Sequence, residues 1–192
     1  MNNSDKIEPI KAEKAKDMKL EHIKSAVLAG KIFIYPTDTI YGIGCDATNQ
    51  ESVNKIKEIK QRDKDKPISI IAPSKEWIKQ HCIINQELDI DKYLPGPYTL
   101  ILKKQDPNFM NHISNTDSLG IRIPNNNFCK QIQKANKPFV TTSINIAGES
   151  PYTQIKQIPK QIKNQVDHII EQGGLSGHPS TLVINGKEIK RD

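Results

Sequence analysis

The chain has 192 residues, enough for one domain with a hydrophobic core, and 35% of them are hydrophobic. No apolar run approaches the length of a membrane span, and the N-terminus has no apolar segment of the signal-peptide kind, so we expect a cytoplasmic protein. The net charge of +6 suits an anionic partner such as a nucleotide or RNA, whereas an aromatic content of 5% leaves few platforms for stacking single-stranded RNA.

Hydrophobic periodicity predicts one α/β domain over residues 17–192, preceded by a charged tail or edge strand over residues 1–16. In chain order, helical spacing predicts helices over 18–29, 50–60, 74–80, 85–93, 128–135 and part of 152–165. Short apolar runs predict strands around 7–10 and over 32–35, 68–72, 98–102, 118–123, 139–142, 166–170 and 181–184. Because strands and helices alternate without a repeat, we expect a twisted sheet of mixed strand direction.

The most unusual segment runs from Tyr35 to Ala47 and reads YPTDTIYGIGCDA. It follows the strand predicted over 32–35 and combines several hydroxyl side chains with two glycines. Hydroxyl groups supply hydrogen-bond donors and acceptors, and glycines let the backbone come close to a ligand. Ligands of open α/β sheets bind at the carboxyl ends of strands. The segment therefore predicts a ligand-binding loop.

Two later segments place cations where they could bind an anion. In KQRDKDKP, Lys60 and Arg62 are two residues apart, so in an extended segment both point to one side and suit phosphate or carboxylate. The alternative is a solvated charge run at a helix end, in which Asp63 and Asp65 neutralise the cations. In SLGIRIP, Arg122 interrupts an apolar strand, where it must pair, reach solvent or bind an anion.

Hydroxyl and amide side chains adjoin two other predicted strands. In TTSINIAG, Ser143 and Asn145 could bind the phosphate or ribose of a nucleotide, or merely cap the following turn. In HPST, Ser180 could contact a phosphate or simply begin the last strand. The sequence contains no phosphate-binding G-x-x-x-x-G-K-[ST] motif, no Ser-His-Asp signature and no histidine pair at metal-ligand spacing. Donors and cations therefore predict catalysis by positioning and charge stabilisation, without a covalent intermediate on the protein.

The three cysteines, Cys45, Cys82 and Cys129, are scattered and odd in number, which is not the pattern of a disulfide framework. We expect ordinary reduced thiols. Cys45 lies in the glycine-rich segment, which leaves a reactive nucleophile as an alternative, although no histidine is near it in the sequence.

Six motifs in order resemble those of the YrdC-like threonylcarbamoyl-AMP synthases of tRNA modification. They are YPTDTIYGIGCDA, KQRDKDKPISI, PGPYTLIL, SLGIRIP, TTSINIAGESP and HPSTLV, and the resemblance covers roughly residues 18–184. The resemblance implies an open, twisted α/β sheet with a basic concave face. It also implies a reaction in which L-threonine, bicarbonate and ATP give threonylcarbamoyl-AMP and pyrophosphate. A separate protein complex then transfers the threonylcarbamoyl group to adenosine in tRNA.

The resemblance also implies roles for individual residues. Lys60 and Arg62 stabilise the charge that develops on the phosphate oxygens, with Mg²⁺ bridging the phosphates of ATP and no metal ligand assigned to the protein. The implied contacts are Lys60, Arg62, Ser118, Ser143 and Asn145 for ATP, and Thr37, Tyr41, Lys66, Arg122, Thr141 and Ser180 for threonine. Among the latter, Arg122 is the expected carboxylate clamp.

Two departures and two alternatives accompany this interpretation. Asp63 stands where many relatives have proline, and longer relatives carry a second domain over the active site, so we expect the short, single-domain form. Any lid would then come from the chain's own ends or a partner. One alternative is a carbamoyl-adenylate-forming domain of hydrogenase maturation. Another is a module that binds double-stranded RNA or tRNA without catalysis, and weak RNA affinity is also compatible with the enzyme.

Overall fold

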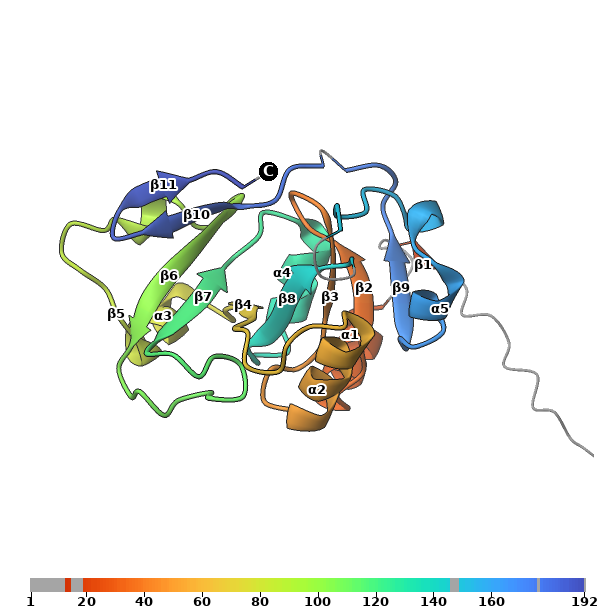
Figure 1. The fold of residues 1–192 in the computed structure, drawn as a ribbon, viewed down its shortest axis with the longest axis horizontal. Coiled ribbons are helices and arrows are strands. Elements are labelled where there is room, and N and C mark those ends of the chain that lie inside the picture. Colours follow the sequence, from red (N-terminus) through yellow and green to blue (C-terminus); the bar gives the residue numbers. More distant parts are fainter. Residues whose placement is uncertain (1–12, 15–18, 146–148, 176, 192) are drawn as a thin grey trace, which may run out of the picture.

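The computed structural model describes residues 13–14, 19–145, 149–175 and 177–191. These residues form an open, twisted sheet of mixed strand direction with helices on its two faces (Figure 1). The sheet order is β1-β9-β2-β3-β8-β4-β7-β6-β10-β11, and β5 pairs with β6 outside this path. The strands are β1 Glu13–Lys14, β2 Phe33–Pro36, β3 Tyr41–Gly44, β4 Ser69–Ile71, β5 Cys82–Ile83, β6 Tyr98–Lys104, β7 Ser118–Arg122, β8 Phe139–Ser143, β9 His168–Glu171, β10 Thr181–Ile184 and β11 Lys187–Ile189.

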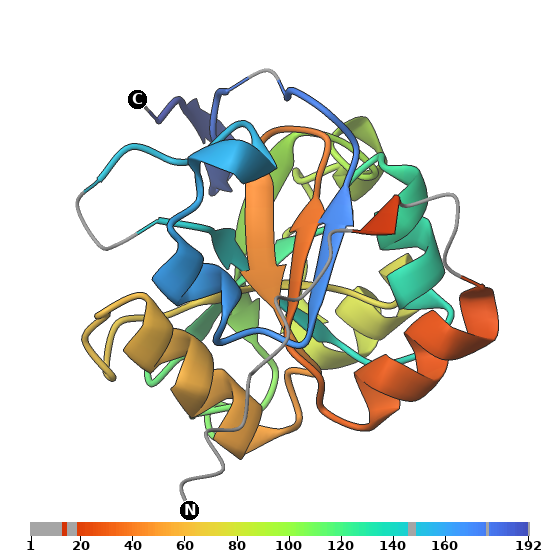
Figure 2. The same ribbon diagram turned by 90° about the vertical axis from the view of Figure 1, so that its right-hand side faces the viewer.

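Helices pack on both faces of this sheet. They are α1 Leu20–Leu28, α2 Gln50–Ile59, α3 Lys75–His81, α4 Asn127–Gln133 and α5 Lys160–Lys163, with 3₁₀ turns η1 Ile90–Lys92 and η2 Ile155–Gln157. Figure 2 shows α1 and α4 on one side of the sheet and α2 on the other. The alternation of side chains along β2 explains the two layers, since Phe33 and Tyr35 pack with α1 and α4, while Ile34 faces the core that includes α2.

Local sequence signals account for where the helices begin. Asn49 precedes α2, and its side chain accepts a hydrogen bond from the amide of Ser52. Asn126 caps α4 in the same way, by accepting from the amides of Phe128 and Cys129. The helices predicted over 18–29, 50–60, 74–80 and 128–135 are confirmed with small shifts at their ends.

One predicted element needs correction, because the helix expected over 85–93 is only the 3₁₀ turn η1. The helix expected over part of 152–165 is present as the one-turn α5, which follows the 3₁₀ turn η2. The short strands β5 and β11 were not predicted. The strand expected around residues 7–10 lies outside the described residues, although β1 does pair in parallel with β9.

The segment predicted as one binding loop is largely a buried strand. Residues 41–44 form β3 between β2 and β8, so the loop itself shrinks to residues 37–40. A Cβ atom on Gly44 would lie 1.9 Å from the carbonyl oxygen of Val140, so this glycine permits close approach of neighbouring strands. Of the two glycines, Gly42 alone lines the cavity described below.

All three cysteines are buried and unbonded to one another. Burial raises the pKa of the Cys45 thiol, and its side chain is fully enclosed. The expectation of reduced thiols is thus confirmed, and the alternative of a reactive Cys45 nucleophile is wrong. In the described part of the chain, no helix has the length and apolar character needed to cross a membrane.

Candidate active site

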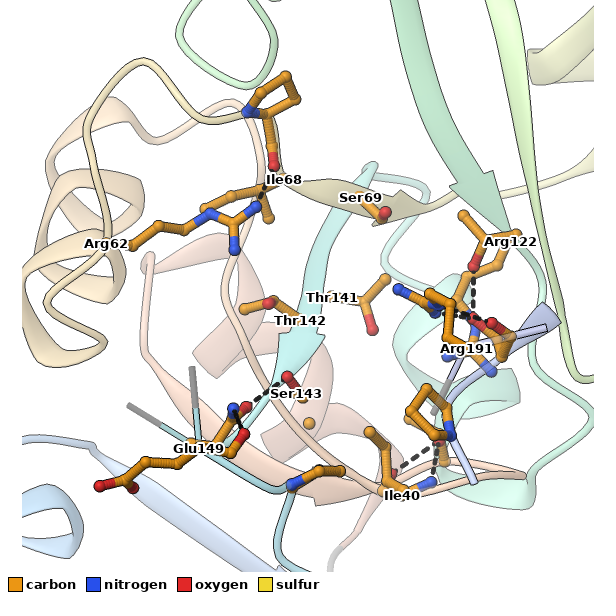
Figure 3. A pocket seen from close by; sticks show the side chains of 18 residues that line it. Ile40, Arg62, Ile68, Ser69, Arg122, Thr141, Thr142, Ser143, Glu149 and Arg191 are labelled. Atoms are coloured by element: carbon orange, nitrogen blue, oxygen red, sulfur yellow. Dashed lines mark hydrogen bonds between the residues drawn. The ribbon is translucent and has the colours of Figure 1, made fainter. Parts of the chain in front are cut away.

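A cavity of about 260 Å³ opens where several strands end. Most of its lining comes from segments that are far apart in the sequence but adjacent in the sheet (Figure 3). The lining residues are Thr37, Ile40, Gly42, Arg62, Pro67, Ile68, Ser69, Thr99, Arg122, Thr141, Thr142, Ser143, Asn145, Glu149, Pro151, Pro179, Ser180 and Arg191. Hydroxyl side chains and three arginines dominate this list, so the cavity suits a polar, anionic ligand.

The structure brings most of the predicted site residues together. Those that line the cavity are Thr37, Arg62, Arg122, Thr141, Ser143, Asn145 and Ser180. Figure 3 shows Arg62 on one side, Arg122 and Arg191 on the other, and Ser69, Thr141 and Thr142 between them. Positive charge is therefore split between two regions of one cavity.

Four predicted residues are absent from the lining. The Tyr41 hydroxyl donates to the carbonyl of Gly173 at 2.8 Å and accepts from the amide of Gln172 at 3.0 Å, so it holds the chain after β9. Burial raises the Tyr41 pKa. Lys66 is exposed. Ser118 begins β7, and the strand rise puts it about 13 Å from Arg122 at the other end.

The fourth of these residues is Lys60, which does not line the cavity although Arg62 does. The segment between the two residues is not extended. Lys60 ends α2 with helical dihedral angles, and Gln61 has a φ of 49°. The premise on which both side chains were expected to point to one side is therefore not met. Arg62 lines the cavity, whereas Lys60 lies beneath it with 2% of its surface exposed.

Arg122 is held by a buried ion pair at the edge of the cavity. Its Nη2 donates to Oδ1 of Asp38 at 2.6 Å and to Oγ1 of Thr39 at 3.3 Å. Oδ2 of Asp38 accepts from the amide of Asn125 at 2.8 Å. The side chains of Arg122 and Asp38 are 7% and 11% exposed. Of the possibilities that the sequence left open for Arg122, pairing is the one that the structure shows, and the arginine does not face water.

Two guanidinium groups of the cavity retain unused donors. Nε of Arg122 and Nε of Arg62 are buried and have no hydrogen-bond partner among the described residues. Nη2 of Arg62 donates to the carbonyl of Pro67 at 2.6 Å, which fixes the direction of its side chain. Burial lowers the Arg62 pKa, but arginine remains a cation at neutral pH. A buried donor without a partner is costly, so each site favours an acceptor supplied by a ligand.

Sequence reasoning missed the third arginine of the cavity. Nε and Nη2 of Arg191 donate to the carbonyl and the hydroxyl of Ser180 at 2.8 and 2.6 Å. The Ser180 hydroxyl is in turn 2.7 Å from that of Thr99, and both residues are 1% exposed. Thr99 is a polar residue within an apolar strand and could have been noticed, but nothing local marks Arg191. It reaches the cavity because the chain turns back between β10 and β11, and the antiparallel register of Leu182 with Ile189 brings Arg191 opposite Ser180.

Acidic groups are sparse around the cavity. Glu149 is the one acidic residue among the described residues that line it. No group of three or more histidine, cysteine, aspartate or glutamate side chains in the described ranges is arranged to hold a metal ion. Glu149 alone could share a cation with an anionic ligand.

Fold and cavity together define an α/β protein with an open sheet, whose cationic, hydroxyl-lined cavity is built to bind small anionic molecules. A family model described as "Telomere recombination", of Sua5, YciO and YrdC proteins, matches residues 25–191. The chain belongs to this Sua5/YciO/YrdC family, so the family membership predicted from the six motifs is confirmed.

The similarity extends over most of the chain. A protein of Methanocaldococcus jannaschii is 38% identical over 167 residues, which are 85% of this chain and 79% of that protein. The threonylcarbamoyl-AMP synthase of Pseudoalteromonas atlantica is 32% identical, covering 80% of this chain and 84% of that enzyme. The structure of P. abyssi Sua5 complexed with L-threonine has a TM-score of 0.77 and 26% identity, covering 88% of this chain. This chain spans about half of Sua5, since 52% of Sua5 is covered.

Proposed function

We propose that the protein is an L-threonylcarbamoyladenylate synthase, which condenses L-threonine, bicarbonate and ATP to threonylcarbamoyl-AMP and pyrophosphate. The relatives named above support this reaction class. The observation that carries it is the pair of buried, unpartnered Nε donors on Arg62 and Arg122, on two sides of one cavity. Such a cavity suits two anionic ligands at once, as a triphosphate and an amino acid carboxylate would be.

The polar neighbours of each arginine suit a different substrate. Arg62 has Ser143 and Asn145 in the same lining, a combination that suits the phosphates and sugar of ATP. Arg122 has Thr37 and Thr141, whose hydroxyl and carbonyl groups suit the amine and hydroxyl of threonine. Oγ1 of Thr37 donates to the carbonyl of Ile40 at 2.8 Å and accepts from the amides of Thr39 and Ile40 at 3.1 and 3.3 Å, so this hydroxyl is used within its own loop.

The chemistry requires positioning and charge stabilisation. A carbamate oxygen of N-carboxythreonine attacks the α-phosphorus of ATP, the new P–O bond forms, and the bond to pyrophosphate breaks in line. Charge grows on the phosphate oxygens during this step, and Arg62 lies where a cation would stabilise it. No histidine or cysteine occurs among the described residues of the lining, consistent with a reaction that forms no covalent intermediate on the protein.

Mg²⁺ would accompany the ATP. Magnesium sites in nucleotide enzymes use one or two carboxylates together with the substrate phosphates, and the single lining carboxylate, Glu149, fits that requirement. When bound, the ion would neutralise charge on the phosphates. Glu149 itself lies beside the nucleotide-side residues, because its backbone carbonyl accepts from Nδ2 of Asn145 at 2.5 Å.

The product would be consumed outside this protein. Threonylcarbamoyl-AMP would serve a transferase complex that modifies tRNA in the cytoplasm, and the positive net charge is compatible with weak tRNA binding. These partners follow from the proposed reaction.

The direct test is an omission assay. Protein is incubated with ATP, Mg²⁺, bicarbonate and threonine, each omitted in turn, and the adenylate is detected by mass spectrometry. The proposal expects product only in the complete mixture, together with pyrophosphate. Product formed from carbamoyl phosphate in place of threonine would instead indicate the hydrogenase-maturation activity. Tight tRNA binding without any adenylate would indicate the non-catalytic RNA-binding module.

Variants then test the site. Arg62→Met should lower kcat/KM for ATP at least about 100-fold, which is an order of magnitude typical of lost transition-state charge stabilisation. Lys64→Met is the matched control, since Lys64 is an exposed cation of the same loop outside the cavity lining. Equal activity of Arg62→Met and wild type would exclude the assigned role.

A further inference from the structure

Lys60 carries a buried charge whose hydrogen bonds all go to one turn of the protein. Its Nζ donates to the carbonyl of Ser143 through a short contact, to the carbonyl of Asn145 at 2.8 Å and to Oδ1 of Asn145 at 3.3 Å. An ammonium group has three N–H donors, so these three acceptors use them all. None is left for a phosphate oxygen.

The turn that Lys60 holds presents the nucleotide-side groups of the cavity. Oδ1 of Asn145 also accepts a short hydrogen bond from the Ser143 hydroxyl, and Nδ2 of Asn145 donates to the carbonyl of Glu149. The ammonium requires an oxygen opposite it, so it determines which end of the Asn145 carboxamide faces inward. The inward oxygen then orients the Ser143 hydroxyl, whose own oxygen lines the cavity as an acceptor.

Holding this turn with a buried ammonium group carries a desolvation penalty. Lys60 is 2% exposed and has backbone and amide dipoles as partners, with no carboxylate contact among the described residues. Burial, together with the nearby charge of Arg62, lowers its pKa to about 7. An apolar side chain would fill the same space without this desolvation penalty. The penalty is explained if the charge fixes the geometry of a functional turn.

We propose that Lys60 is a positioning residue, which locks residues 143–145 in the conformation that binds the nucleotide and does not itself contact the phosphates. This inference rests on the proposed function, because it takes ATP as the ligand of that turn. It replaces direct phosphate contact by Lys60, the role that the sequence motif implies, with an action through Asn145 and Ser143.

A double-mutant cycle distinguishes the two roles. Dissociation constants for a non-hydrolysable ATP analogue are measured by calorimetry for wild type, Lys60→Met, Asn145→Ala and the double variant. If Lys60 acts through Asn145, each single variant weakens binding about tenfold or more, and the double variant is no weaker than the worse single one. If the two single effects multiply in the double variant, Lys60 does not act through the Asn145 side chain and the proposal is overturned.

Two controls keep the outcome interpretable. In the variant that combines Lys60→Met with Arg191→Met, the effects on the dissociation constant of the ATP analogue should multiply, because the two residues share no contact. For Lys60→Met itself, an unchanged affinity for threonine and an intact thermal transition show that the protein is folded. If Lys60→Met does not fold, Lys60→Gln replaces it. The Asn145 side-chain amide resonance of the free protein should shift in the Lys60 variant, and an unchanged resonance would oppose a positioning role.

Different experimental results would contradict the proposed function and the positioning role of Lys60. A wild-type protein that binds the ATP analogue but forms no adenylate would overturn the synthase activity while leaving the coupling between Lys60 and Asn145 measurable. Adenylate formation together with multiplicative effects would overturn only the positioning role.

Discussion

Removing the charge of Asp38 should destabilise the protein through Arg122. In Asp38→Asn the buried guanidinium of Arg122 loses the carboxylate that lies 2.6 Å from its Nη2. Breaking a buried pair by removing one partner costs about 3–5 kcal/mol. Asparagine retains one acceptor oxygen and the side chains of the pair are 7% and 11% exposed, so we expect a loss just below that range, about 2–3 kcal/mol.

The assay is urea unfolding followed by the fluorescence of Trp77, the single tryptophan of the chain. Asp65→Asn serves as the control, since Asp65 is exposed, and it should change the free energy of unfolding by less than about 0.5 kcal/mol. The double variant Asp38→Asn/Arg122→Met should recover part of the loss, because no uncompensated charge remains buried. A cost below about 1 kcal/mol for Asp38→Asn would refute the claim that Arg122 depends on this ion pair.

Three further predictions address packing, the cavity and pH. Gly44→Ala should cost at least about 2 kcal/mol in thermal or urea unfolding, because the new methyl group would meet the Val140 carbonyl; wild-type stability would contradict the close approach of these strands. Thr99→Val keeps the shape but removes the hydroxyl that supports Ser180 and Arg191, so steady-state assays should show a KM raised severalfold for one substrate; unchanged KM values would exclude this support. The Lys60 pKa is lowered to about 7 in the folded protein, whereas the ordinary pKa of a lysine is 10.5. Between these two pH values Lys60 is protonated in the unfolded chain but largely deprotonated in the folded protein, so the free energy of unfolding rises with pH. From pH 7 to 9.5 the unfolding free energy of wild type should rise about 2–3 kcal/mol more than that of Lys60→Met, and parallel pH curves would contradict it.

The sequence was most informative where the signal is local or strongly patterned. The helices α1, α2 and α4 follow from apolar periodicity and, for α2 and α4, from asparagine caps. The six motifs identified the family, and the polar residues at strand ends do gather in one cavity. These features depend on neighbours in the chain or on a recognisable order of short motifs.

The errors arose where contacts between residues far apart in the sequence determine the local conformation. Gly44, one of the two glycines that suggested a binding loop, serves strand packing against Val140. The rule that residues two apart share a side does not apply to Lys60 and Arg62, because the left-handed Gln61 between them breaks the extended conformation that the rule requires. Arg191 was missed because no hairpin was predicted after residue 184, and it is the register of β10 with β11 that brings this arginine to Ser180.

The cavity collects its lining from residue 37 to residue 191, and this has a consequence for synthesis and turnover of the chain. A nascent chain cannot complete the cavity until the strand β10 and the segment after it have left the ribosome. A ligand of the cavity therefore stabilises only the completely synthesised, folded chain. At 100 times its dissociation constant, such a ligand adds about 2.7 kcal/mol to the free energy of unfolding. Substrate supply would in this way set how long the folded protein resists proteolysis, with truncated chains gaining no such protection.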